Sequence, residues 1–172
     1  LRRSSAASDV YKRQPIMFEI QNIKEIPLLR VNAHVFKHSK FGCTHLHLAC
    51  DSTEKAFSVA FRTIPKDHSG IAHILEHTVL CGSEKFPVRD PFFMMTRRSL
   101  STFMNAMTYP DITAYPFATL NDKDYRNLLS VYLDAAFFPN IDELDFMQEG
   151  HRFELIKDGD KEKLALKGVV YN

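Results

Sequence analysis

The residues best suited to chemistry stand in one short segment, His73-Ile74-Leu75-Glu76-His77. The spacing of its apolar residues predicts a helix from Gly70 to about Leu80. Residues four apart lie on one face of a helix, so His73 and His77 can share one zinc ion. Glu76 lies beside them on that face. It would serve as a general base, because zinc lowers the pKa of a bound water toward about 7.

This pattern is specific for its chemistry. About 0.02 such matches are expected by chance in a chain with this histidine and glutamate content. It inverts the more common His-Glu-x-x-His order, and a helix presents the ligands equally well in either order. The alternative is two surface histidines beside a solvated glutamate. The apolar residues Ile71, Ile74, Leu75 and Val79 argue against it, because they place much of this helix in a core.

The elements that must position this helix are a mixture of strands and helices. Alternating apolar residues predict strands at 28–36, 43–50 and 56–64, with the first two forming a hairpin, and further short strands at 102–107, 113–118 and 152–156. Besides the first helix, which Ser69 would cap, the predicted helices are 91–99, a longer one from Asn121 or Asp122 to about Phe138, and 142–149. We therefore expect an α+β fold, in which helices pack on an antiparallel or mixed sheet.

Composition restricts the class of protein. The chain has 172 residues, 45% of them hydrophobic and 14 of them Phe, which is enough for one domain with a sizeable core and excludes intrinsic disorder. The net charge is +1, and no basic stripe with interleaved aromatics indicates a nucleic-acid partner. No apolar run approaches the roughly 18 residues of a membrane span. The three cysteines form no CxxC pair, which favours a reducing compartment.

The two ends of the sequence differ from the part between them. Residues 1–14 are rich in Ser, Ala and Arg, the chain begins with Leu1, and the first methionine is Met17. We interpret residues 1–14 as a non-native or targeting remnant. The last residues form an apolar run with no turn or capping signal. We interpret residues 15–172 as one catalytic domain that is incomplete at its C-terminal end.

The segment Ser69–Ser83 resembles the inverted-motif zinc peptidases of the pitrilysin/insulysin superfamily, in particular the presequence protease branch. Further stretches match that branch in order, namely 86–93, 99–106, 127–134, 148–150 and 167–172. The resemblance as a whole covers about residues 19–172. It implies the N-terminal part of a zinc endopeptidase built from repeated α+β domains that close into a chamber. Such enzymes degrade unstructured peptides, including cleaved targeting sequences, in the mitochondrial matrix, another organelle or the bacterial cytoplasm.

The resemblance assigns roles to individual residues. His73 and His77 are expected to be zinc ligands and Glu76 the general base. Asn105 and Ala106 match positions at a strand on whose edge the peptide substrate pairs by strand addition. Alternatively, Asn105 is an ordinary amide side chain in a strand or turn and has no role in substrate binding.

The resemblance also implies that the zinc site needs more than this chain. A catalytic zinc normally takes three protein ligands, and in this branch the third is a glutamate directly after the run that ends here at Asn172. Glu149 and Glu154 are weaker candidates. The second half of the family enzyme, which contributes to substrate binding, also lies outside the chain. We therefore predict that the chain alone is inactive and binds zinc weakly.

Other interpretations remain open at this point. The chain could be a non-catalytic structural or presequence-binding relative of the same superfamily, although such relatives typically lose the metal-binding residues. His45 and His47 share a face of a strand and are better explained as a sheet-surface pair than as a metal site. Cys81 is better explained as a buried inert thiol than as a redox sensor.

Overall fold

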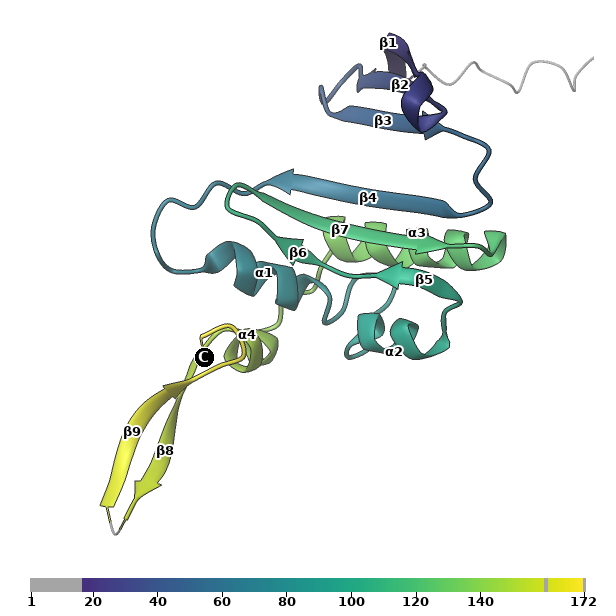
Figure 1. Cartoon of the computed structure of the whole chain (residues 1–172). Helices are drawn as coiled ribbons and strands as arrows, with labels where there is room; N and C mark the ends of the chain where they lie inside the picture. The colour runs from purple at the N-terminus through teal and green to yellow at the C-terminus, as the bar shows by residue number, and fades with distance from the viewer. Residues whose placement is uncertain (1–16, 160, 172) are drawn as a thin grey trace, which may run out of the picture. The chain divides into compact units, whose positions relative to one another are not determined.

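The computed structural model describes residues 17–159 and 161–171, which form two compact units that divide between Ser52 and Thr53 (Figure 1). Our interpretation of residues 1–14 lies outside the described residues. The expected α+β class is confirmed, since antiparallel sheets and helices alternate along the chain.

The first unit is a three-stranded antiparallel sheet. Strands β1 (Phe18–Ile26), β2 (Val31–His38) and β3 (Thr44–Ala49) lie in that order, and a 3-10 turn, η1 (Pro27–Leu29), joins the first two. The predicted hairpin corresponds to β2 and β3. Strand β1 was not predicted, because a bulge between Ile20 and Asn22 breaks its two-residue alternation.

The second unit contains the sheet that carries the core. The strand order is β4 (Lys55–Arg62), β7 (Ile112–Thr119) and β5 (Ser101–Met104), and the short β6 (Met107–Thr108) also pairs with β7. All of these pairings are antiparallel. The single strand predicted at 102–107 is therefore two strands, with a break at residues 105–106.

In its described residues, the second unit has four helices: α1 (Ile71–Val79), α2 (Pro91–Arg98), α3 (Asp122–Phe137) and α4 (Glu143–Glu149). The side chain of Asn121 caps α3 by accepting bonds from the N–H groups of Lys123 and Asp124. The predicted cap of α1 is wrong. Gly70 occupies the N-cap position with a φ of 70°, and the Ser69 N–H instead bonds the Asp67 carboxylate at 2.9 Å.

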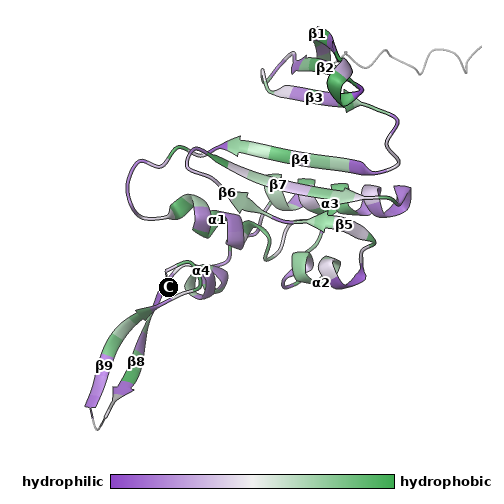
Figure 2. Cartoon of the chain, viewed as in Figure 1, coloured by the Kyte–Doolittle hydropathy of each residue, from purple (hydrophilic) through white to green (hydrophobic). Residues whose placement is uncertain are grey.

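The core lies between α3 and the sheet. Helix α3 runs along the sheet and contacts β7 and β4 (Figure 1). Phe117, Leu128 and Tyr132 are almost completely buried there. Strand β4 is hydrophobic over most of its length (Figure 2), and its residues Phe57, Val59 and Phe61 pack against this core. Val79, at the end of α1, belongs to the same cluster, so the core anchors one end of the helix that carries the two histidines. No helix in the described part of the chain is long and apolar enough to cross a bilayer.

The burial of Leu128 in this core leads to a prediction about stability. Leu128 is 0% exposed, so Leu128→Ala should lower the free energy of unfolding by about 2–5 kcal/mol through lost burial and the cavity left behind. Urea unfolding followed by circular dichroism measures the change. Leu100→Ala is the matched control, because Leu100 is 66% exposed and should change stability by less than about 0.5 kcal/mol. Equal losses for the two variants would contradict this account of the core.

Helix α4 is followed by a hairpin, after which the returning segment, residues 168–171, comes back to the end of α4. Strands β8 (Arg152–Asp158) and β9 (Lys161–Lys167) pair with each other, whereas only the first part of β8 was predicted. Beyond the hairpin, the N–H groups of Val169 and Val170 bond the carbonyls of Gln148 and Glu149 at 3.3 and 2.8 Å. The backbones meet so closely that a Cβ on Gly168 would lie 1.8 Å from the Gly150 carbonyl oxygen. The returning segment is therefore packed against the end of α4.

Candidate metal centre

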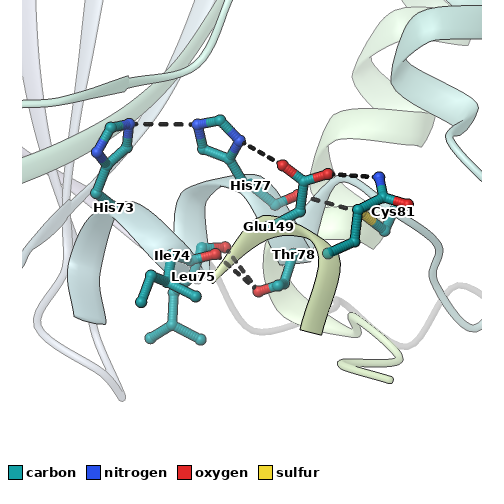
Figure 3. A network of polar contacts seen from close by, with 8 residues as sticks. His73, Ile74, Leu75, His77, Thr78, Cys81 and Glu149 are labelled. Carbon is teal, nitrogen blue, oxygen red and sulfur yellow. Dashed lines mark hydrogen bonds and ion pairs between the residues drawn. The ribbon is translucent and has the colours of Figure 1, made fainter. Parts of the chain in front are cut away.

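One face of α1 brings its two histidines together. The Nε2 atoms of His73 and His77 lie 3.2 Å apart, and in Figure 3 the two rings face each other. Glu76 completes the group, in which the ligand atoms all lie within 4.8 Å of one another. His73 is exposed and His77 half-buried, but Glu76 is only 7% exposed. Among the residues that the structure describes, no other group of three or more such side chains is this close together.

The donor set fits zinc. Imidazole nitrogens bind zinc at about 2.0–2.1 Å in tetrahedral geometry, which places two of them about 3.3 Å apart. The observed separation of 3.2 Å between the two Nε2 atoms matches this edge of the tetrahedron. Two imidazoles with a neighbouring carboxylate are also the ligand types that zinc prefers. The spacing of His73 and His77 is therefore compatible with a shared zinc ion.

Glu149 approaches His77 from the opposite side of its ring. Its Oε2 lies 2.9 Å from Nδ1 of His77, and its side chain is 12% exposed (Figure 3). A carboxylate only accepts hydrogen bonds, so Nδ1 carries the proton and Nε2 presents its lone pair toward His73. Metal-binding histidines commonly make such a bond, which fixes the tautomer and the ring orientation.

This geometry separates the two glutamates named as alternative ligands. Glu149 contacts Nδ1 of His77, the nitrogen that points away from His73. From there it can orient the His77 ring but does not share a ligand position with the two Nε2 atoms. Glu154 lies on β8, where its carboxylate bonds Arg152. The Glu149–His77 contact could not be predicted from the sequence, because the two residues are 72 positions apart and no local pattern links them.

A cavity of about 240 Å³ opens beside this group. Glu76 and His77 line one part of it, and Asn105 and Ala106 another, so the structure brings together four of the five residues singled out from the sequence. Its apolar lining comes chiefly from Leu80, Phe92 and Phe93. The cavity thus joins the candidate general base to a surface suited to an apolar side chain.

The backbone at Asn105 is tied down on several sides. Its N–H bonds the Pro116 carbonyl at 3.1 Å, and its carbonyl accepts a 3.3 Å bond from the Tyr132 hydroxyl. Burial raises the pKa of Tyr132, which keeps this hydroxyl protonated as a donor. The Asn105 side chain accepts a bond from the N–H of Ala106 at 3.0 Å. These bonds hold the break between β5 and β6 in place at the rim of the cavity.

Burial also affects Tyr115, which lies on β7 and is 4% exposed. Burial, with a smaller contribution from the charge of Glu76, raises its pKa to about 12. The phenol therefore stays neutral at physiological pH.

Cys81 follows α1 directly, and its environment makes it unreactive. Burial raises its pKa to about 12, and the carboxylates of Asp145, Asp90 and Glu149 act in the same direction. Its thiol donates to the His77 carbonyl at 3.4 Å. The thiolate is the reactive form, and a raised pKa lowers its fraction at pH 8 to the order of 10⁻⁴.

We expect Ellman's reagent at pH 8 to modify two of the three cysteines quickly, since Cys43 and Cys50 are exposed and Cys81 is buried. The third should react only after unfolding in guanidinium. Cys81→Ala should leave the number of fast thiols at two. Three fast thiols in the folded protein would contradict this assignment.

The remaining histidines on the first sheet make aromatic contacts. His47 lies opposite His34 across the β2–β3 pair, with ring centroids 5.9 Å apart, and the His45 ring lies 5.7 Å from Phe36. These contacts agree with the interpretation of His45 and His47 as a sheet-surface pair.

Comparison with known proteins identifies the family. Residues 62–163 match the family described as "Insulinase (Peptidase family M16)". The chain is 54% identical to the mitochondrial presequence proteases of Mus musculus, over 156 residues, and Candida albicans, over 157 residues. Each match covers 90% of this chain but only 15% of the relative. The crystal structure of pitrilysin matches with a TM-score of 0.63 at 19% identity, over 74% of this chain and 14% of that one. The chain belongs to peptidase family M16, the insulinase family.

Proposed function

We propose that this chain is the N-terminal catalytic part of a zinc metalloendopeptidase that hydrolyses unstructured peptides such as cleaved presequences. The observation that carries the proposal is the pairing of His73 and His77 at zinc-binding separation, with Glu76 beside them. The names of its relatives support a presequence substrate and a mitochondrial location. Because the chain spans about 15% of the length of these relatives, the activity belongs to a longer protein.

His73 and His77 would hold the zinc through Nε2. When bound, zinc supplies Lewis acidity, which polarises the scissile carbonyl and makes a water molecule more acidic. Glu76 would accept the proton of the attacking water and then deliver it to the leaving amine. Its low exposure suits this role, because it limits competing contacts with bulk water. Glu149 would keep His77 oriented throughout.

The third zinc ligand would be a glutamate directly after Asn172 in the longer protein. The support is the returning segment, whose Val170 N–H bonds the Glu149 carbonyl at 2.8 Å. The Glu149 side chain in turn contacts His77 at 2.9 Å. The backbone at Val170 is therefore held beside the residue whose side chain contacts His77.

The substrate would lie across the cavity. Strand addition satisfies the peptide backbone with little demand on sequence, and Asn105 and Ala106 would contact it close to the scissile bond. An apolar substrate side chain would enter between Leu80, Phe92 and Phe93. A non-catalytic relative is the alternative, and the presence of His73, Glu76 and His77 together favours the enzyme.

Zinc binding by the chain tests the assignment of ligands. With two of three protein ligands, the 172-residue chain should bind zinc roughly 10²–10³-fold more weakly than the longer protein, because each ligand contributes about 3–4 kcal/mol. The chain should also show no peptidase activity. Competition with a chromophoric chelator measures the affinities, and His73→Ala serves as the control that should remove the residual binding. Tight, stoichiometric zinc in the chain alone would overturn the three-ligand assignment.

A further inference from the structure

We propose that Arg89 and Gln148 are positioning residues: they hold the Glu149 carboxylate in place, so that it keeps His77 as the Nδ1–H tautomer with Nε2 facing His73. Glu149 bonds His77 directly. Gln148 bonds the other oxygen of the Glu149 carboxylate, and Arg89 bonds Gln148. The relevance of this arrangement to zinc rests on the proposed function, whereas the arrangement itself does not require the metal.

A continuous series of hydrogen bonds carries the inference. Arg89 Nη2 donates to Gln148 Oε1 at 2.6 Å, and Gln148 Nε2 donates to Glu149 Oε1 at 2.8 Å. The other carboxylate oxygen, Oε2, lies 2.9 Å from His77 Nδ1. Both oxygens of Glu149 are therefore engaged, one by each neighbour. The bond from Arg89 also fixes which end of the Gln148 amide faces Glu149, because a guanidinium can only donate.

The series joins three separate parts of the second unit. Arg89 lies in the loop between α1 and α2, Gln148 and Glu149 lie in the last turn of α4, and His77 lies on α1. A carboxylate held through only one oxygen can rotate away from its partner, whereas one held through both is restricted. The two bonds of Gln148 thus restrict the side chain on which the tautomer of His77 depends.

The surrounding charges favour the same role for Arg89. Asp90 and Asp145 lie close to Glu149, and burial together with neighbouring carboxylates, Asp142 foremost, raises the pKa of Asp145. Arg89 opposes this effect on Asp145, and its Nε lies 3.7 Å from the Asp90 carboxylate. The contact with Asp90 holds the Arg89 side chain where its Nη2 meets Gln148, so Arg89 acts on Glu149 through the Gln148 amide.

The spectroscopic test uses the metal-free, ¹⁵N-labelled chain at a fixed pH of about 8.5, where imidazoles are neutral. Long-range ¹H–¹⁵N spectra, with His77 assigned by comparison with His77→Gln, report its tautomer. We expect Nδ1–H to predominate in the wild type and its share to fall in Gln148→Leu and Arg89→Met. Arg89→Met/Gln148→Leu should match Gln148→Leu alone, because Arg89 acts through Gln148. Arg97→Met, which alters an exposed arginine on α2, is the matched control and should leave the spectrum unchanged.

Zinc affinity of the longer protein provides the second measurement. Glu149→Gln should weaken zinc binding about 10–100-fold, and Gln148→Leu about 3–10-fold, because loss of an outer hydrogen bond loosens the ligand. An unchanged His77 tautomer in folded Gln148→Leu would overturn the inference, as would additive effects of the Arg89 and Gln148 substitutions. A tautomer change in a protein that binds no zinc would support the positioning role and refute the proposed zinc site instead.

Discussion

Glu76→Gln in the longer protein is expected to lower kcat for peptide hydrolysis by about 10²–10⁴-fold, the usual contribution of a general base. An amide of the same shape cannot accept the proton of the attacking water. Glu76 is 7% exposed and lies among the ligand atoms of His73 and His77. Glu149 also lines the cavity, but its two carboxylate oxygens are engaged by His77 and Gln148. Zinc content should stay the same, because the two histidines are untouched. Mass spectrometry of bound metal and a fluorogenic peptide assay measure the two quantities.

Two further variants make this result interpretable. His77→Ala should lose zinc and activity together, which separates a missing ligand from a missing base. Glu84→Gln alters an exposed glutamate shortly after the same helix and should keep both. Normal turnover by Glu76→Gln would remove Glu76 from the role of general base, whereas loss of zinc in that variant would make it a ligand.

Gly168→Ala is expected to have the largest effect on the structure near the site. The added Cβ would meet the Gly150 carbonyl oxygen at 1.8 Å, and backbone atoms cannot move aside as a flexible side chain can. We expect the free energy of unfolding to fall on the order of 3 kcal/mol, a loss typical of severe overpacking. The bonds from Val169 and Val170 to α4 should open at the same time. Urea unfolding measures the first effect, and hydrogen exchange at the Val170 amide the second.

Gly159→Ala is the control for Gly168→Ala. Gly159 lies between β8 and β9 with a φ of 65°, and a Cβ there would meet nothing within 4 Å. The left-handed backbone makes alanine cost about 1 kcal/mol at Gly159, with no effect on the Val170 amide. If both variants lost the same stability and left exchange at Val170 unchanged, the close approach of Gly168 to Gly150 would not hold the returning segment.

The parts of this molecule that depend on local sequence could be predicted. The helical spacing of residues 70–80 was enough to place His73, Glu76 and His77 on one face, where the structure has them. The expectation that the apolar residues of this helix lie in a core holds for Val79 but is wrong for Ile71 and Leu75, which are 59% and 39% exposed. The cap of α3 was predicted to be Asn121 or Asp122, and the structure has Asn121, whose side chain acts on residues two and three positions away. The apolar alternation of Phe57, Val59 and Phe61 on β4 likewise corresponds to the face that packs on the core.

The parts of the structure that depend on contacts outside the local pattern could not be predicted from the sequence. Glu149 reaches His77 only because α4 packs against α1, which no short-range pattern encodes. Strand β9 alternates its apolar residues over too short a run among lysines to be distinguished from a loop. Ser69 had the right residue type for a cap, but Asp67 bonds the Ser69 N–H and Gly70 takes the left-handed conformation that begins α1. For Ser69, a competing contact determined the outcome.

The β8–β9 hairpin leaves and rejoins the domain at neighbouring points, since Gly150 and Gly168 touch at its base. A change in its length therefore need not alter the distance between the two ends. The tip at Gly159 is a natural insertion point for an epitope or a fluorescent reporter, and lengthening both strands equally would preserve their pairing. The hairpin can therefore change in size while α1 keeps the same neighbours.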